Sequence, residues 1–483
     1  MKKFGLYING QYIHASDYLK KDSFDPRGEA FSSEFSVLNS DNTESQELVE
    51  AAMQGASETL LQVRRGFFPL KERIEFLHTL INEIQKSEEN LARVIAGEIS
   101  KPLSLARGEV ARSISTLEAT IKEAKTFEER TLFDSPKAKG FSQRVPKGIA
   151  FAITPFNFPL NLSLHKIAPA ILCGCPVLFK PSDKALLSAL YLVDLIHASK
   201  LPAGMFSYLN CDNSLTTQLC QDSRISHVSF TGSAHVGWLL KQKAAGSITL
   251  ELGGNAPIYI DESADLKSAA QKCAQGAFAY GGQVCISVQH VFAHKKILKE
   301  FTQLLCDETK NFPYGDVYNE STLSSQLINS DATERVSKTI QEQQASGAKI
   351  IARSENYVGE TAAKTKYLSP TLLEGVDLKS NFFCSEIFGP VASLNPIDSF
   401  EDWVEFANNL ENRLQCGIFS EQSTQFTEAQ NSLDYGGVMI NNSPMLRLDE
   451  MPYGGQGMAG LGREGPRYAL EDFSTWKVVL EAK

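Results

Sequence analysis

The chain has 483 residues, a formal net charge of −10 and a pI of about 5.5. A negative net charge is the wrong sign for a protein that binds phosphate backbones by neutralising them. Its 42% hydrophobic and 22% charged residues are typical of a globular protein and exclude a fibrous or fully disordered chain. No apolar run approaches the roughly 20 residues that a membrane-spanning helix needs. We therefore expect neither a nucleic acid nor a membrane partner.

The cysteines indicate a reducing compartment. There are nine, an odd number, and they lack the spacing of a disulfide framework. The close pair Cys173 and Cys175 has no second pair to complete a zinc site, so we expect a structural role and no metal. The first residues, broken by Gly5 and Asn9, lack the apolar core of a signal peptide. Together these features predict a cytoplasmic protein.

Helical periodicity dominates the first third of the chain. Apolar residues recur at spacings of three and four between Ile74 and Ile84, and similar patterns occupy about 44–62 and 104–125. These segments are predicted to form amphipathic helices.

From Gly148 onward, short apolar runs alternate with helical segments. The expected strands are Ile149–Ile153, Val177–Lys180, Phe206–Leu209, Val228–Phe230 and Ile248–Leu250. Such alternation is typical of repeated βαβ units, so it predicts a mostly parallel, doubly wound sheet.

A second alternating series follows and predicts a second α/β domain. It consists of a strand at Ala256–Ile260, an apolar run from Val284 to Phe292, a long helix from about 296, and strands near 348–352 and 437–440.

Two segments belong to neither series: a polar stretch at 123–145 and a terminal strand at Thr475–Leu480. The length corresponds to about three folding units, so these pieces are expected to form a small third element. Because an isolated strand and a short hairpin leave edges that another subunit can cover, we expect a homo-oligomer.

The first candidate for chemistry is Cys285, in Gly281–Ser287. A cysteine between a glycine pair and an apolar strand can lie on an open turn, where a substrate reaches its sulfur and its backbone N–H points at a developing oxyanion. Taken alone, the segment is more typical of a small buried cysteine. A free thiol has a pKa of about 8.5, so a nucleophile here requires a lowered pKa or the help of a base.

Two further segments carry polar groups suited to the same chemistry. Glu251 ends an apolar strand and precedes two glycines, and a glutamate in an apolar site can act as a general base. Asn157 lies between aromatics and two prolines, which can aim its amide at an oxyanion. Alone, each has an ordinary interpretation, as a capping or solvated carboxylate and as a turn asparagine.

Six segments, in this order and spacing, resemble the signature set of the aldehyde dehydrogenase superfamily: Pro155–Pro159, Phe179–Ser182, Phe230–Ser233, Glu251–Gly254, Gln283–Cys285 and Glu386–Pro390. The segments Gly282–Gln289 and Met451–Gly455 are most similar to the lactaldehyde-dehydrogenase-like branch. The resemblance implies two doubly wound α/β domains and a small β oligomerisation element, assembled as a homodimer or homotetramer.

The resemblance also implies a mechanism. The Cys285 thiolate attacks an aldehyde, and the oxyanion is held by the Asn157 amide and the Cys285 N–H. Hydride passes to a nicotinamide cofactor, and water activated by Glu251 hydrolyses the remaining thioester to the acid.

The cofactor contacts implied by the resemblance come from both halves of the chain. Lys180 is expected at the adenosine ribose, Glu386 and Phe388 at the nicotinamide ribose, and Ser233 at the pyrophosphate, where a helix begins. The remaining cofactor contacts are Pro155, Phe230, Gly232 and Asp183. Because the Asp183 carboxylate repels a 2′-phosphate, we expect NAD, with NADP possible; the alternative is that Asp183 is merely solvated.

Pattern and resemblance together assign the domains. The dinucleotide-binding domain is expected at 1–122 and 146–253 with part of 450–466, the catalytic domain at 254–449, and the oligomerisation element at 123–145 and 467–483.

Two other motifs carry no function. The segment Gly455–Gly460 matches G-x-G-x-x-G, but no strand precedes it and no βαβ unit follows it. His290 and His294 are four residues apart, yet their neighbours predict a strand rather than a metal-binding helix.

The substrate is less determined than the reaction. Phe158 is expected to line the substrate passage, and Arg447 either contacts an anionic substrate or is an exposed structural arginine. The alternatives to an acid-forming enzyme are a coenzyme-A-acylating dehydrogenase and a catalytically silent structural protein of the same fold. Glu251 argues against the first, and the complete set of Cys285, Glu251 and Asn157 argues against the second.

Overall fold

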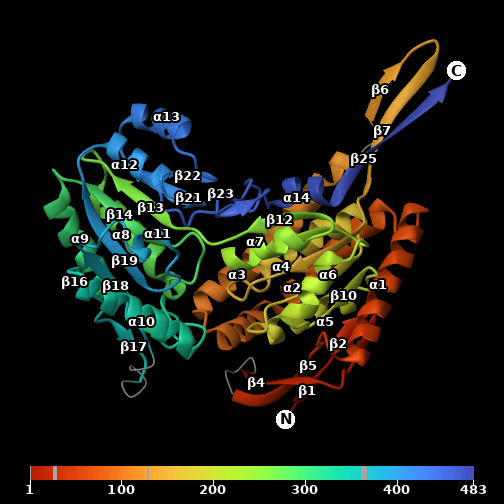
Figure 1. Cartoon of the computed structure of the whole chain (residues 1–483), viewed down its shortest axis with the longest axis horizontal. Helices are drawn as coiled ribbons and strands as arrows, with labels where there is room; N and C mark the ends of the chain where they lie inside the picture. The colour runs from red at the N-terminus through yellow and green to blue at the C-terminus, as the bar shows by residue number, and fades with distance from the viewer. Residues whose placement is uncertain (1, 25–29, 128–129, 361–366) are drawn as a thin grey trace.

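The structure is a computed structural model that describes residues 2–24, 30–127, 130–360 and 367–483. Figure 1 shows two lobes side by side and a narrow arm of strands that projects from the lobe containing the N-terminus. The C-terminus lies at the far end of this arm. The expected α/β architecture, two sheet-based lobes plus a small β element, is confirmed.

The first lobe is built on an eight-stranded sheet. In spatial order its strands are β24 (Gly460–Leu461), β12 (Ser247–Glu251), β11 (Ile225–Thr231), β8 (Ile149–Ile153), β9 (Val177–Lys180), β10 (Phe206–Tyr208), β2 (Leu6–Ile8) and β3 (Gln11–Ile13). The strands from β12 to β10 run parallel, and the outer ones are antiparallel. Every residue of β8 is buried, as expected at the centre of a sheet covered on both faces.

Helices pack around this sheet (Figure 1). They are α1 (Thr43–Arg64), α2 (Leu70–Ile99), α3 (Leu103–Lys122), α4 (Asn161–Cys173), α5 (Leu186–Ala198), α6 (Asn213–Gln221), α7 (Ala234–Lys243) and α14 (Pro466–Phe473), with a 3₁₀ turn at Glu123–Phe127. Side-chain caps stabilise the N-termini of several of these helices. At α1, for example, the Asn42 side chain accepts a hydrogen bond from the Ser45 N–H. The three predicted amphipathic helices correspond to α1, α2 and α3.

Most predicted strands of the first lobe have nearly the expected bounds. Ile149–Ile153 and Val177–Lys180 agree fully, Phe206–Leu209 ends one residue earlier, and Val228–Phe230 and Ile248–Leu250 lie inside longer strands.

The amino-terminal strands were not predicted. Besides β2 and β3, a separate sheet contains β1 (Lys2–Phe4), β5 (Ala30–Ser36) and β4 (Tyr18–Phe24). Strands β1, β2 and β3 have three residues each, which is too short for an alternating pattern to appear.

The second lobe has a seven-stranded sheet. In spatial order its strands are β16 (Lys349–Arg353), β18 (Thr371–Glu374), β19 (Val391–Ile397), β14 (Val288–His294), β13 (Ala256–Ile260), β21 (Gln415–Phe419) and β22 (Gly437–Ile440). All neighbours pair in parallel except the antiparallel edge strand β16.

Helices and short strand pairs complete this lobe. They are α8 (Leu266–Phe278), a 3₁₀ turn at Ala279–Gly282, α9 (Leu298–Asn311), α10 (Ser330–Ala345), α11 (Asn381–Cys384), α12 (Phe400–Asn408), α13 (Ser423–Ser432), β15 (Tyr314–Gly315) with β17 (Tyr357–Val358), and β20 (Asn412–Arg413) with β23 (Gln456–Gly457). The predicted helix from about 296 is α9. Within the apolar run from Val284 to Phe292, the Ser287 N–H bonds to the Val284 carbonyl and closes a turn, so the strand β14 begins at Val288.

The β arm consists of β6 (Arg130–Asp134), β7 (Ala138–Pro146) and β25 (Ser474–Ala482), all antiparallel. It joins the two segments that fitted neither α/β series. Residues 467–473, grouped with this element in the sequence, instead form most of helix α14, whose Ala469, Leu470 and Phe473 belong to the first lobe's core.

The loop that carries Cys285 lies where the lobes meet. Its neighbours Tyr280, Val284 and Ile286 belong to the core of the first lobe, although the strand that follows belongs to the second. The Cys285 loop therefore packs into the first lobe while leading directly into the sheet of the second lobe.

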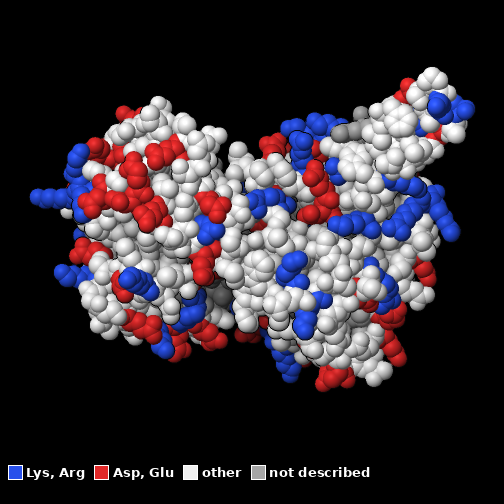
Figure 2. All heavy atoms as spheres, turned by 45° about the horizontal axis from the view of Figure 1, so that its top comes forward, with Lys and Arg blue, Asp and Glu red and all other residues white. Residues whose placement is uncertain are grey.

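Acidic and basic side chains occur on both lobes of the face drawn in Figure 2. Across the ranges described above, no helix is both long enough and apolar enough to cross a membrane.

Candidate active site

The site forms along the carboxyl edge of the first sheet. In the strand register Ile153 pairs with both Lys180 and Phe230, and Thr231 pairs with Glu251. Parallel strands end at one edge, so the predicted segments that follow β8, β9, β11 and β12 come together there, as ligand sites do in open α/β sheets.

The Cys285 loop is shaped by consecutive left-handed residues: Tyr280, Gly281 and Gly282 have φ values of 54°, 63° and 67°. A Cβ at Gly282 would lie 2.2 Å from the Gly389 carbonyl oxygen, so only glycine fits without displacing the backbone. The loop leaves Cys285 half-buried, whereas seven of the nine cysteines are buried.

The thiol has a polar neighbour that sequence reasoning did not select. Cys285 Sγ lies 2.9 Å from the hydroxyl of Tyr453. Burial raises the pKa of Cys285 to about 12, and the charges of Glu386 and Glu251 raise it too, while Tyr453 and Arg447 act in the opposite direction. From the sequence, a nucleophilic Cys285 requires either a lowered thiol pKa or a base that removes the thiol proton. Because the pKa of the thiol is raised, the second alternative, a base, remains.

Asn157 lies beside the Cys285 loop. Its side chain is buried, and Nδ2 donates a hydrogen bond to the Gln283 carbonyl at a distance of 3.0 Å. The Gln283 side chain is itself held, because its Oε1 accepts from the Ile328 N–H at 2.8 Å. The amide is therefore fixed two residues from the thiol.

Glu251 is buried at the end of β12, and neither carboxylate oxygen has a hydrogen-bond partner. Burial holds its pKa well above the usual range, and the charge of Glu464 adds to this. A Cβ on Gly454 would lie 3.0 Å from Glu251 Oε1, so the carboxylate lies next to the residue that follows Tyr453. A carboxyl in this environment binds a proton more readily than a solvent-exposed one does.

A buried ion network lies behind Glu251. Lys166 pairs with Glu464 and donates to Ser229 Oγ at 3.1 Å, and Arg447 Nη2 lies 3.7 Å from Glu464 Oε2. Sequence reasoning missed Lys166 and Glu464; a lysine inside an apolar helix and a glutamate between glycines were the only signals.

Glu386 reaches the same region from the second lobe. A Cβ on Gly253 would lie 2.3 Å from its Oε2, its Oε1 has no partner, and burial raises its pKa to about 8. Phe388 has a left-handed φ of 50° and packs edge-on against Phe156. The Gly254 backbone N–H hydrogen bonds the Glu386 carboxylate, whose Oε1, left without a partner beside bare glycine backbone, fits a ligand with hydroxyl donors, such as a ribose.

The other predicted cofactor residues lie along the first sheet. Lys180 is half-buried, burial lowers its pKa, and exposed Asp183 follows in the turn before α5. Ser233 caps α7, accepting from the Val236 N–H at 3.4 Å.

Two further predicted cofactor segments lie next to these residues, one after β11 and one after β8. The Phe230 ring closes over Gly232, whose N–H donates to the Glu251 carbonyl at 3.0 Å. Pro155 is half-buried in the turn after β8.

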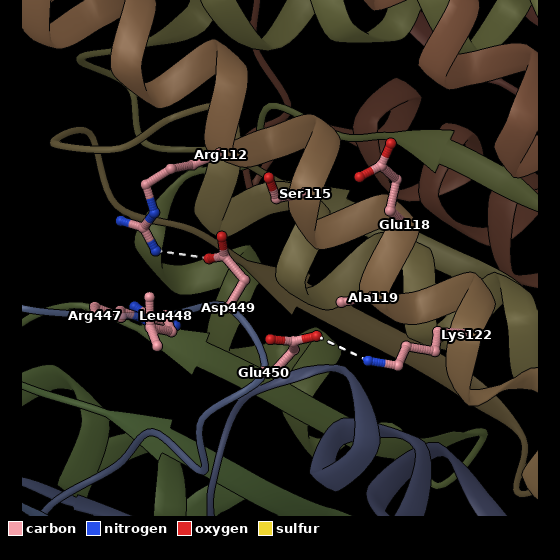
Figure 3. A pocket seen from close by; sticks show the side chains of 9 residues that line it. All are labelled: Arg112, Ser115, Glu118, Ala119, Lys122, Arg447, Leu448, Asp449 and Glu450. Carbon is pink, nitrogen blue, oxygen red and sulfur yellow. Dashed lines mark hydrogen bonds and ion pairs between the residues drawn. The ribbon is translucent and has the colours of Figure 1, made fainter.

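A pocket of about 530 Å³ opens beside this centre, between α3 and the loop Arg447–Glu450 (Figure 3). Arg112 is paired with Asp449 at 2.6 Å and Lys122 with Glu450 at 3.1 Å.

The two predicted substrate-passage residues differ in their placement. The Arg447 side chain is only 7% exposed, so its interpretation as an exposed structural arginine was wrong. Its guanidinium lies 3.6 Å from the centre of the Tyr453 ring, and its Nε and Nη2 have no hydrogen-bond partner. Phe158 does not line the pocket; its ring contacts Lys101 and Tyr280.

Comparisons with known proteins agree with this geometry. The model of the aldehyde dehydrogenase family matches residues 34–479. Lactaldehyde dehydrogenase from Methanococcus aeolicus is 32% identical, covering 98% of this chain and 99% of the relative, and 3-sulfolactaldehyde dehydrogenase from Priestia aryabhattai is 31% identical over 99% and 98%.

The structural comparison gives the same result. Aldehyde dehydrogenase 21 from Physcomitrella patens, solved with the reaction product succinate, superimposes with a TM-score of 0.90 and 30% identity, covering 100% of this chain and 98% of that one. This chain belongs to the aldehyde dehydrogenase family, in which a cysteine thioester mechanism is typical, and is an NAD(P)-dependent oxidoreductase that oxidises an aldehyde.

Proposed function

We propose that Cys285 forms the thioester and that Glu251 activates the water that hydrolyses it. The observation that carries this division is the contrast between their surroundings: Cys285 is a partly exposed residue, and the Glu251 carboxylate is buried without a hydrogen-bond partner. A buried carboxyl with a raised pKa is suited to accept a proton from the thiol or from water. The Asn157 amide and the Cys285 N–H stabilise the oxyanion of the hemithioacetal.

Asn157 can be tested separately, because Asn157→Ala leaves the thiol in place. Loss of one oxyanion donor typically lowers kcat by roughly 10²–10³-fold. An Asn157→Ala enzyme with the parental kcat would remove this residue from the mechanism.

The cofactor is assigned to residues of both lobes. Lys180 and Asp183 hold the adenosine ribose, Ser233 the pyrophosphate, and Glu386 and Phe388 the nicotinamide ribose. When bound, the nicotinamide accepts the hydride. The remaining contacts, which form the wall beneath the cofactor, are Pro155, Phe230 and Gly232.

Asp183 makes NAD the preferred cofactor, because its carboxylate repels a 2′-phosphate. Asp183→Ser is expected to raise kcat/KM with NADP relative to NAD. An unchanged ratio would place Asp183 outside the cofactor site.

Coenzyme A is not the acyl acceptor in this proposal. An acylating enzyme has no use for a water-activating base, and Glu251 is buried where it can serve only a group inside the site. NADH formation with and without coenzyme A, with product analysis, tests this: free acid at equal rates supports hydrolysis, and acyl-coenzyme A contradicts it.

The substrate is proposed to be an aldehyde with a second, anionic group. Arg112 and Lys122 are already paired with carboxylates, whereas Arg447 keeps two buried donors without acceptors. Its acidic neighbour Glu464 is 3.7 Å away and already bound by Lys166. Among the relatives, one is named for 3-sulfolactaldehyde and one was solved with succinate, and both compounds are anions.

A matched substrate pair tests this proposal: a four-carbon semialdehyde with a terminal carboxylate, and butanal. Arg447→Met is expected to lower the ratio of their kcat/KM values by roughly tenfold to a hundredfold, the worth of a hydrogen bond to a charged group. Lys122→Met, which removes a paired pocket cation, is the control and leaves the ratio nearly unchanged. A parental ratio in Arg447→Met would exclude Arg447 from substrate binding; a wider panel with lactaldehyde and glycolaldehyde then identifies the substrate.

The enzyme is proposed to be a homodimer or homotetramer joined through the β arm. Trp476, Val478 and Leu480 lie on one face of β25 and are 42%, 56% and 65% exposed. Such an apolar face on a projecting sheet is typical of a subunit contact. Val478→Asp with Leu480→Asp is expected to give monomers in light scattering, whereas Lys477→Asp on the opposite face retains the oligomer. A monomeric parent enzyme would contradict the proposal.

The domain limits given above, with 467–473 moved to the first lobe, and the cytoplasmic location remain proposals. The cysteines are free thiols and seven of them are buried, which suits a reducing compartment.

A further inference from the structure

We infer that Tyr453 is a catalytic residue that donates a hydrogen bond to the Cys285 sulfur, holding it for attack and favouring the thiolate. Its hydroxyl lies 2.9 Å from Sγ, and no other side chain in the described part of the chain hydrogen bonds this sulfur. The inference rests on Cys285 being the nucleophile, as proposed above.

The tyrosine is held rigidly. It is 3% exposed, and its backbone is paired with Glu464 through two hydrogen bonds of 2.9 and 2.6 Å. One face of its ring is covered by the Arg447 guanidinium at 3.6 Å. The backbone hydrogen bonds and the stacked guanidinium both restrain the ring. Its hydroxyl is therefore preorganised, and little entropy is lost in directing it at the sulfur.

The proton stays on Tyr453. Burial, and then the neighbouring charge of Cys285, hold the pKa of this phenol well above its usual range. Between a phenol that stays protonated and a sulfur that ionises, the tyrosine is the donor and the thiolate the acceptor. Such charge-assisted hydrogen bonds are roughly twice as strong as neutral ones.

The electrostatics around the thiol explain why a donor is needed. Of the charged groups that face Cys285, Arg447 favours the thiolate, whereas Glu386 and Glu251 disfavour it, as does burial itself. Tyr453 adds a favourable interaction without adding a charge. This separates its role from that of Glu251, which takes up a proton.

The test measures thiolate formation directly, without turnover. In a Cys384→Ser background, which removes the other accessible thiol, the rate of alkylation of Cys285 by iodoacetamide is followed by intact mass across pH. Below the thiol pKa this rate is proportional to the thiolate fraction. Tyr453→Phe removes only the hydroxyl and is expected to lower the rate by roughly tenfold or more, the worth of a hydrogen bond to a charged group. kcat/KM for the aldehyde falls in parallel.

Tyr435→Phe is the matched control, because it removes a buried hydroxyl that bonds the Ala407 carbonyl at 2.9 Å, away from the thiol. Its alkylation rate is expected to equal that of the parent. Replacing the Tyr453 ring with its fluorinated analogue makes a stronger donor and is expected to increase the rate, which provides a second test if Tyr453→Phe folds poorly.

Equal rates in the parent and in Tyr453→Phe, or no increase with the fluorinated ring, would overturn the inference. A different result would contradict the assignment of Cys285 as the nucleophile. Complete alkylation of Cys285 with retained dehydrogenase activity would exclude it, whatever the effect of Tyr453.

Discussion

At the scale of single residues, two buried carboxylates next to each other have opposite environments. Glu251 has no hydrogen-bond partner, and burial raises its pKa. Burial also acts on Glu464, but the charges of Lys166 and Arg447 outweigh it and hold the pKa of Glu464 below its usual value. Carboxyls whose pKa values are pushed apart can serve as proton acceptor and as fixed charge in one site.

Replacing Glu251 tests this assignment. Glu251→Gln keeps the size and shape of the side chain but cannot take a proton. The thioester is therefore expected to form and then to be hydrolysed slowly. A stoichiometric burst of NADH followed by a much slower steady state, with added acyl mass on Cys285, is the expected result. If Glu251 also deprotonates the thiol, the burst is slower but keeps its amplitude.

Cys285→Ala is the control for this experiment and forms no NADH at all. Parental turnover in Glu251→Gln, or acyl mass on another cysteine, would contradict the mechanism.

Glu386 makes stability depend on pH. Its pKa is raised from 4.5 to about 8, so between these values the folded enzyme holds a proton that the unfolded chain has released. Stability of the cofactor-free enzyme therefore falls as pH rises across this window. Glu386→Gln removes that dependence, and its Tm relative to the parent is expected to increase from pH 5 to pH 8. A constant difference between the two Tm values would show that Glu386 does not titrate there.

At the scale of elements, the Cys285 loop depends on the approach of two backbones. Gly282 combines a left-handed φ with a contact to Gly389 that leaves no space for a Cβ. The loop therefore holds its shape through packing between segments distant in sequence.

A pair of glycine substitutions separates strain from contact. Gly347→Ala places a Cβ in open space at a φ of 105°, so it is expected to cost only the conformational strain, about 1–3 kcal/mol. Gly282→Ala adds the clash with Gly389 and is expected to cost more stability and most of the activity. Chemical denaturation with kcat measurements checks both. Equal effects of the two substitutions would show that the contact does not shape the site.

At the scale of the whole molecule, the proposed cofactor contacts come from both lobes, Lys180 from the first and Glu386 from the second. NAD at about a hundred times its Kd is expected to stabilise the fold by about 2.7 kcal/mol, seen as a higher Tm by calorimetry. Lys180→Met and Glu386→Gln each weaken binding and reduce the shift at the same NAD concentration. A shift unchanged in both variants would place the cofactor elsewhere.

The sequence alone predicted the type of reaction, the proposed site residues and much of the architecture. Cys285, Glu251 and Asn157 stand in short motifs, and strands such as Ile149–Ile153 and Val177–Lys180 are apolar runs, so both are local properties of the chain. Three-residue strands at the amino terminus escaped prediction because so short a segment has no period.

Only the tertiary structure decided which groups meet. Cys285 and Tyr453 are 168 residues apart, and Lys166 and Glu464 are 298 apart, so no local pattern joins them. The pKa directions of Glu251 and Cys285 depend on burial and on charges distant in sequence, which come close to these residues only in the folded chain.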